Sequence, residues 1–364
     1  MSIKNSGFKM DRKKICKYIK DTSRYIWSKI ENSKAVGVKI QEETVTETIL
    51  INIAKDLYPY TKIKTFHKNE EGINGADWEW YIRIKEGEDT EDLWLGMIVQ
   101  AKILNDNAKN PSYDSLWKID DKTKKYQFEK LLNTAYEKEL LPIYCFYNHL
   151  DNSEILDEYI LGNLEKLKLH KLKSPKKEEF DFHVGGEEKK VIVISNPDYE
   201  QVGRDIIENG AIDFDNELLG WTYTSAFNLY KLDRESQKAK AFGASGAIKN
   251  IPIHNLICKN EINQFIKAVN EDWKQVLIDF HRNMSGNGLE LKDADPKNPR
   301  EFKLRKTSEL PQYVQDMINE KDIDVTKYNG VSHVFLLSLD GLPIINNIAP
   351  HYASSQYISN QEGQ

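Results

Sequence analysis

Two segments rich in aromatic and β-branched residues constrain the fold of this chain more than any other feature. The first, residues 75–84, reads GADWEWYIRI, and the second, residues 94–104, reads WLGMIVQAKIL. The short stretch between them is charged and contains Gly87, Glu88 and Asp89. Apolar and aromatic side chains that alternate with period two on both sides of such a turn predict a β-hairpin.

Polar side chains fall on one face of each predicted strand. Successive side chains of a strand point to opposite faces, so Asp77 and Glu79 share one face of the first strand. Gln100 and Lys102 share one face of the second strand for the same reason. If the hairpin pairs these two faces, a carboxylate, a carboxamide and an ammonium group meet on an otherwise apolar sheet. Such a cluster is costly to bury unless it has a function.

Helix and strand patterns alternate around the hairpin. Helices are predicted over 11–32 and from Gln41 to Pro59, where Thr44 is a candidate cap. A strand is predicted over 61–68, before the hairpin. A helix over 126–138 and a fully apolar strand over 142–147 follow it. From Gln41 onward the order is helix, three strands, helix, strand, which predicts an α/β fold with a mixed central sheet.

The second half of the sequence carries further patterns of the same kinds. Helices are predicted over 154–169, 221–232 and 262–280, and strands over 191–195 and 331–339. This half is therefore also expected to be α/β.

Composition narrows the functional classes. The chain has 364 residues and a formal net charge of −6, so a polyanion would have to meet local lysine clusters, at 118–125 and 166–177. No stretch approaches the roughly 18 apolar residues of a membrane span, and the N-terminus lacks an apolar signal segment. We therefore expect a cytoplasmic protein with no membrane partner. Its widely spaced cysteines, Cys16, Cys145 and Cys258, predict reduced thiols rather than a disulfide framework or a zinc site.

The hairpin cluster has the residue types of metal-assisted phosphodiester hydrolysis. Mg²⁺ prefers oxygen ligands, which Asp77, the Gln100 side-chain carbonyl and the main-chain carbonyl of Ala101 can supply. Lys102 would then orient a water molecule or offset charge on the phosphate. A carboxylate at the start of the helix that precedes the sheet can join the site, and Glu43 and Glu47 are the candidates.

Each of these assignments has a purely structural alternative. Lys102 can pair with Asp77 or Glu79 across a solvent-facing hairpin, which is a common cross-strand contact. Glu79 is either a further metal ligand or a carboxylate that is solvated or paired with Arg83.

The hairpin motifs and the order of elements around them resemble the PD-(D/E)XK nuclease superfamily. GADWEW and QAK, with the later PIYCFYN, also resemble an uncharacterised family of bacterial domains. The resemblance implies a restriction endonuclease-like core of order α-β-β-β-α-β at 37–200. An N-terminal helical segment at 1–36 would precede this core, and an α/β region at 201–364 would set substrate or partner choice.

The resemblance also implies a chemistry. Asp77 and Gln100 would hold Mg²⁺, or Mn²⁺ in its place, and Lys102 would be the catalytic lysine. Gln100 stands where Asp or Glu is more usual, which favours a single cation. The implied activity is nucleic-acid cleavage, of DNA rather than RNA, in anti-phage defence or restriction, by a homodimer or with a defence partner. The alternative is a non-catalytic nucleic-acid-binding or scaffold module on the same fold.

Overall fold

The structure is a computed structural model in which part of the chain is described. The described residues are 12–66, 75–84, 91–105, 113, 116, 119, 126–149, 178–184, 187–193, 220–227, 229, 251–258, 262–282, 301–323 and 331–344. The side chains of 178–184, 187–193 and 278–282 are not part of the description.

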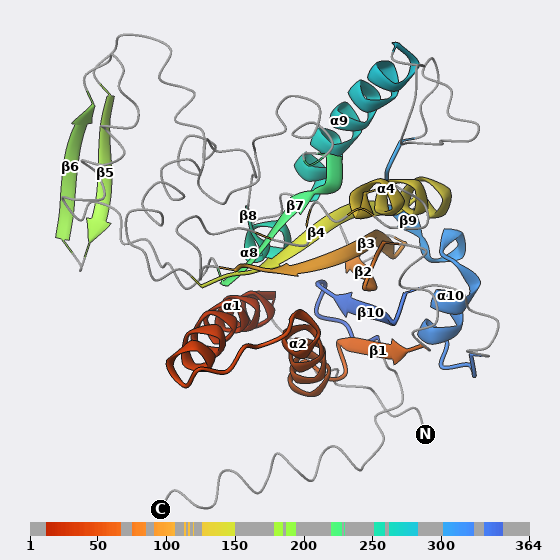
Figure 1. Ribbon diagram of the computed structural model, residues 1–364, viewed down its shortest axis with the longest axis horizontal. Helices are drawn as coiled ribbons and strands as arrows, with labels where there is room; N and C mark the ends of the chain where they lie inside the picture. Colours follow the sequence, from red (N-terminus) through yellow and green to blue (C-terminus); the bar gives the residue numbers. More distant parts are fainter. Residues whose placement is uncertain are drawn as a thin grey trace, which may run out of the picture.

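A mixed sheet of eight strands organises the described residues (Figure 1). Its main path runs β1-β10-β2-β3-β4-β7-β8, and β9 pairs with β3. β10 and β4 run parallel to their neighbours β2 and β3, whereas β2 and β3 are antiparallel. These strands are β1 (Thr61–Thr65), β2 (Trp78–Ile84), β3 (Leu93–Ile103), β4 (Leu141–Tyr147), β7 (Trp221–Ser225), β8 (Ile251–Pro252), β9 (Arg305–Lys306) and β10 (His333–Ser338). The fold is therefore α/β, and the predicted hairpin is confirmed as β2–β3, with Trp78 opposite Val99.

Helices cover both faces of this sheet (Figure 1). α1 (Arg12–Ala35) and α2 (Glu42–Asp56) lie on one side, and α4 (Gln127–Lys138) and α9 (Ile262–Arg282) lie on the other. Two shorter helices are α8 (Ile253–Cys258) and α10 (Gln312–Ile318), and Thr307–Glu309 forms a 3-10 turn. The apolar residues that recur at helical spacing are buried in both α1 and α2. They are Ile15, Ile19, Ile26 and Ile30 in α1, and Val45, Ile49 and Ile53 in α2.

Some sequence predictions need correction. Residues 221–225 form strand β7 rather than a helix, because Thr222 and Thr224 alternate with aromatic residues and the segment pairs with β4. α2 begins one residue after Gln41, which is its N-cap, so Thr44 lies within the helix and not at its cap. β1 ends at Thr65 rather than at 68. The predicted helix over 154–169 lies outside the described residues.

The sheet extends well beyond residue 200. β7, β8 and β10 all come from the predicted C-terminal region, and β10 lies between β1 and β2. β6 (Glu187–Val193) covers most of the strand predicted over 191–195. It pairs with β5 (Glu178–Val184) in a separate two-stranded sheet.

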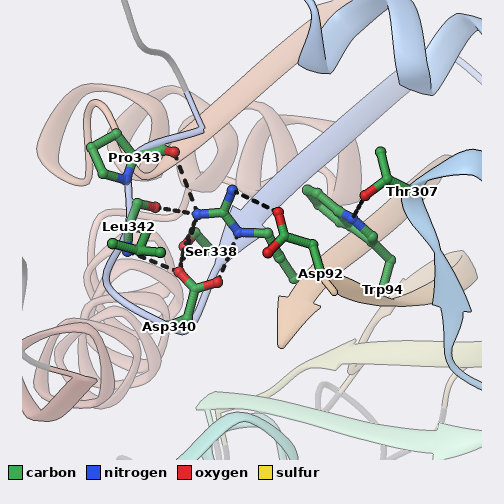
Figure 2. Close-up of polar contacts among 8 residues, drawn as sticks. Asp92, Trp94, Thr307, Ser338, Asp340, Leu342 and Pro343 are labelled. Atoms are coloured by element: carbon green, nitrogen blue, oxygen red, sulfur yellow. Dashed lines mark hydrogen bonds and ion pairs between the residues drawn. The ribbon is translucent and has the colours of Figure 1, made fainter. Parts of the chain in front are cut away.

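A buried arginine fixes the end of β10 to β2. Arg83 donates to both carboxylate oxygens of Asp340, at 2.8 and 3.1 Å, and to Ser338 Oγ at 3.0 Å. It also donates to the main-chain carbonyl oxygens of Leu342 and Pro343 and lies 3.7 Å from Asp92. Figure 2 shows how these groups from two distant parts of the chain converge. Because the Arg83 side chain is almost completely buried, this network fixes residues 338–343 against β2.

The two half-buried cysteines meet although 242 positions separate them in the sequence. The thiols of Cys16 in α1 and Cys258 in α8 share a hydrogen bond. This contact, with nearby Arg12 and Lys20, lowers the pKa of Cys16 to about 7. Burial raises the pKa of Cys145, which lies inside β4.

No helix in the described part of the chain is both long enough and apolar enough to cross a membrane.

Candidate functional site

Asp77 lies immediately before β2, and its backbone is held by two other segments. Its N–H donates to the carbonyl oxygen of Val99 at 2.8 Å. Its own carbonyl oxygen accepts bonds from Ser332 Oγ at 2.7 Å and Ser332 N at 3.2 Å. The position of Asp77 therefore depends both on β3 and on the segment that leads into β10.

Gly75 lets this loop pass close to α4. Its φ is +67°, and a Cβ at this position would lie 2.7 Å from the carbonyl oxygen of Gln127. A larger residue would be strained by both its backbone and its neighbours.

The carboxylate of Asp77 is bonded to the end of β3. Its Oδ2 atom accepts a hydrogen bond from Gln100 Nε2 at 2.6 Å and another from the Ala101 N–H at 2.7 Å. Gln100 Oε1 in turn accepts a bond from Gln127 Nε2, at the start of α4, at 2.8 Å. The amide of Gln100 thus presents its nitrogen, not its oxygen, to Asp77.

Lys102 faces a carboxylate at the first position of α2. Its Nζ lies 3.6 Å from Glu42 Oε1, and the side chains of Lys102 and Glu42 are only 5% and 16% exposed. Burial raises the pKa of Glu42 to about 8. The negative charges of Asp77 and Glu43 act in the same direction, whereas Lys102 opposes them. Glu42, Asp77, Gln100 and Lys102 therefore form one electrostatically connected group, called here the Glu42–Lys102 cluster.

Glu42 was missed by the sequence analysis, which named Glu43 and Glu47. Both of those side chains are exposed, and Glu43 influences the cluster only through its charge. A signal for Glu42 was present in the sequence. It precedes the buried residues Val45 and Thr46 by three and four positions, so it continues their face of the helix.

Glu79 belongs to a different cluster. Its fully buried carboxylate accepts hydrogen bonds from the hydroxyl groups of Tyr81 and Tyr313 and from Lys138 Nζ, which lies 2.6 Å away. Both of its oxygens are thus engaged by protein donors, which is the arrangement of a structural buried charge rather than a metal ligand. Nor does Arg83 pair with Glu79, since its partner is Asp340.

Tyr144 lies in β4 directly opposite Gln100. Its side chain is fully buried, and its hydroxyl has no hydrogen-bond partner in the part of the chain that the structure describes. Burial, with added contributions from Asp77 and Glu42, raises its pKa well above the ordinary value. The hydroxyl therefore stays protonated and remains a donor.

Comparison with protein families gives a match over most of the sequence. One family model matches residues 15–340, a range that contains the whole Glu42–Lys102 cluster and β10. The chain belongs to the DUF6615 family. DUF6615 is described as a family of unknown function. No curated protein and no solved structure matches the chain.

The donor set of this DUF6615 chain can be tested against a divalent cation. No group of three or more His, Cys, Asp and Glu side chains that could hold a metal occurs among the described residues. The cluster offers two carboxylates, Glu42 and Asp77, and one amide. Mg²⁺ typically binds one or two carboxylates and retains several waters, so this set fits it once the Gln100 amide turns its oxygen toward Asp77.

That rotation has a partner close at hand. The neighbouring amide of Gln127 can rotate with Gln100, so that its oxygen then accepts from the Gln100 nitrogen. The rotation gives up the bonds that this nitrogen donates to Asp77 and, at 3.2 Å, to the carbonyl oxygen of Ala101.

The predicted lysine clusters lie outside the described residues. Tyr113, which precedes the first of them, is buried and donates to Asn148 Oδ1 at 2.6 Å. It therefore anchors its segment to the end of β4 and is not a surface contact.

Proposed function

We propose that this protein is a Mg²⁺-dependent nuclease with a restriction endonuclease-like core, acting on DNA in preference to RNA. The observation that carries the proposal is the Glu42–Lys102 cluster itself. Its members come from three elements, namely α2, the segment before β2, and β3. The element order α2, β1, β2, β3, α4, β4 agrees with the α-β-β-β-α-β order of that core.

The residues of the cluster would have two roles in hydrolysis, which are metal binding and positioning of the reacting groups. Glu42 and Asp77, with the amide oxygen of Gln100, would hold the cation, which supplies charge stabilisation at the phosphate and a more acidic water. Lys102 is nearly buried and is aligned by Glu42, so its ammonium group can orient the attacking water or the phosphate oxygens. Addition of water across one P–O bond leaves a phosphomonoester and a free hydroxyl group.

Cleavage assays with plasmid DNA and a structured RNA test this proposal directly. We expect cleavage with Mg²⁺ or Mn²⁺, none with EDTA, and a loss of at least about 100-fold in Lys102→Ala. Lys55→Ala is the matched control, because Lys55 is an exposed lysine near the far end of α2 and should keep full activity. Equal cleavage by the wild type and Lys102→Ala would refute the proposal.

The biological setting that we propose is anti-phage defence or restriction in the cytoplasm, by a homodimer or with a partner protein. An unregulated nuclease damages the DNA of its own host, so its activity has to be restricted to conditions such as phage infection. Cells that express the wild-type protein should resist phage or suffer toxicity, and Asp77→Asn and Lys102→Ala should abolish both effects.

A second candidate is a non-catalytic nucleic-acid-binding or scaffold module. The specific observation in its favour is the orientation of Gln100, whose amide nitrogen satisfies Asp77 without a cation. Melting temperatures in Mg²⁺, Mn²⁺ and EDTA separate the two candidates. A scaffold shows no metal-dependent shift, whereas an intact site is stabilised by mass action.

A further inference from the structure

Two tyrosines of β4 make opposite use of their hydroxyl groups. Tyr144 and Tyr147 are both fully or almost fully buried, and they lie three positions apart on one strand. Tyr147 Oη shares a 2.9 Å hydrogen bond with Thr46 Oγ1 of α2. Tyr144 Oη has no partner among the described residues. A buried hydroxyl without a partner is unfavourable, so the fold accepts a cost at Tyr144 that it avoids at Tyr147.

The strand register shows on which face of the sheet the Tyr144 side chain lies. Tyr144 is opposite Gln100 in the parallel β3–β4 pair, and Phe146 is opposite Lys102. Paired residues extend their side chains to the same face of a sheet, so Tyr144 emerges on the face of Gln100 and Lys102. Tyr147 is an odd number of positions away and emerges on the other face, where it meets Thr46, one turn along α2 from Glu42.

Packing further restricts Tyr144 on that face. Its ring stacks on Phe146 with centroids 6.1 Å apart, which limits how far it can swing. The charges of Asp77 and Glu42 act on the hydroxyl groups of both Tyr144 and Tyr147, so the strand face and the missing partner, not the electrostatics, distinguish Tyr144.

We propose that Tyr144 is a positioning residue of the Glu42–Lys102 cluster, and that its hydroxyl oxygen accepts a hydrogen bond from a water molecule in the hydration shell of the bound cation. This inference rests on the proposed metal-dependent function. Mg²⁺ keeps several waters when only a few protein groups bind it, and each such water needs an acceptor or donor around it. Partners of this outer kind strengthen metal binding although they do not touch the metal.

The test compares wild type, Tyr144→Phe and Tyr147→Phe by their melting temperatures. Each is melted in EDTA and then across a titration of MnCl₂ and of MgCl₂ alone. In EDTA we expect Tyr144→Phe to melt at or above the wild-type temperature, because it removes a buried hydroxyl that has no partner among the described residues. Tyr147→Phe should melt lower, because it breaks the bond to Thr46.

The titration then separates the two faces of the strand. Tyr144→Phe should need about tenfold more Mn²⁺ for its half-maximal shift in melting temperature. Tyr147→Phe should respond to Mn²⁺ at the wild-type concentration.

The outcomes distinguish this inference from the function on which it rests. A wild-type protein with no metal-dependent shift would overturn both. A wild-type shift that Tyr144→Phe reproduces at the same Mn²⁺ concentration would overturn the role of Tyr144 alone. Destabilisation of Tyr144→Phe in EDTA to the extent seen for Tyr147→Phe would do the same, since it would mean that the hydroxyl already has a protein partner.

Discussion

The raised pKa of Glu42 makes the stability of the metal-free protein depend on pH, and Glu42→Gln should remove that dependence. Burial moves the pKa from 4.5 to about 8, so between these values the folded protein holds a proton that the unfolded chain has released. Stability falls wherever the folded state binds more protons and the pH rises. The contribution of Glu42 is therefore fully present below about pH 4.5, is lost progressively up to about pH 8, and changes no further above that.

The size of this effect follows from the pKa. A difference between 4.5 and about 8, at about 1.4 kcal/mol for each pH unit, corresponds to at most about 5 kcal/mol of unfolding free energy. Lys102 already offsets part of the burial, and its attraction is included in this value. Because glutamine cannot ionise, Glu42→Gln keeps the neutral form at every pH.

Urea denaturation in EDTA between pH 5 and pH 9 measures the effect. The difference in unfolding free energy between Glu42→Gln and wild type should grow by several kcal/mol across this range, in favour of the variant. The control is Glu43→Gln, which changes an exposed neighbour and should keep most of the wild-type pH dependence. Parallel pH profiles for Glu42→Gln and wild type would refute the assignment of a buried, protonated carboxyl at this position.

Three further predictions concern other parts of the fold. Asp340→Asn should destabilise the protein by about 3–5 kcal/mol in urea denaturation, because it removes the close carboxylate partner of the buried Arg83 guanidinium and leaves the more distant Asp92, at 3.7 Å. An effect below about 1 kcal/mol would contradict that account. Gly220→Ala should lower the unfolding free energy by about 2–3 kcal/mol in the same assay, because the new Cβ would lie 2.1 Å from the carbonyl oxygen of Ser23 in α1. Wild-type stability of this variant would show that α1 is not fixed against residue 220. Iodoacetamide at pH 7.5 should modify Cys16 at least about tenfold faster than Cys145 in mass spectrometry, because the pKa of Cys16 is about 7 whereas Cys145 is buried and its pKa is raised. Equal rates would contradict the lowered pKa of Cys16 and the burial of Cys145.

Local features of the fold could be predicted from the sequence. The β2–β3 hairpin joins neighbouring segments, so its alternating pattern and its acidic turn were enough to place Asp77 beside Gln100. The stripes of α1, α2 and α9 were equally clear, since helical periodicity is contained in a short window.

Long-range pairing could not be predicted in the same way. Nothing in the pattern of residues 61–65 shows that their neighbour is β10 rather than β2, because an apolar strand fits many partners. The contact between Cys16 and Cys258 is also long-range, and their positions in the sequence do not predict it. β7 was assigned to a helix because Tyr223, Phe227 and Tyr230 also fit a helical face, and only its pairing with β4 decides the matter.

The site residues show the same division. The hairpin supplied Asp77, Gln100 and Lys102, but the choice of the helix carboxylate depended on how α2 meets the sheet. Glu42 is at the first position of the helix, close to Lys102, whereas Glu43 faces outward. The partners of Glu79 include Lys138 of α4 and Tyr313 of α10, which are distant from it in the sequence and could not be predicted from the strand pattern.

The insertion of β10 between β1 and β2 has a consequence for protein synthesis. Among the described strands β1 pairs with β10, and Ser332 holds the backbone of Asp77 although it leaves the ribosome 255 positions later. A nascent chain that has passed residue 200 already contains Glu42, Asp77, Gln100 and Lys102, but it still lacks β10 and Ser332, which hold β1 and the backbone of Asp77. Chains that stall or are released before β10 therefore carry the chemical groups of the cluster without this support, and we expect the complete site only after β10 has been made.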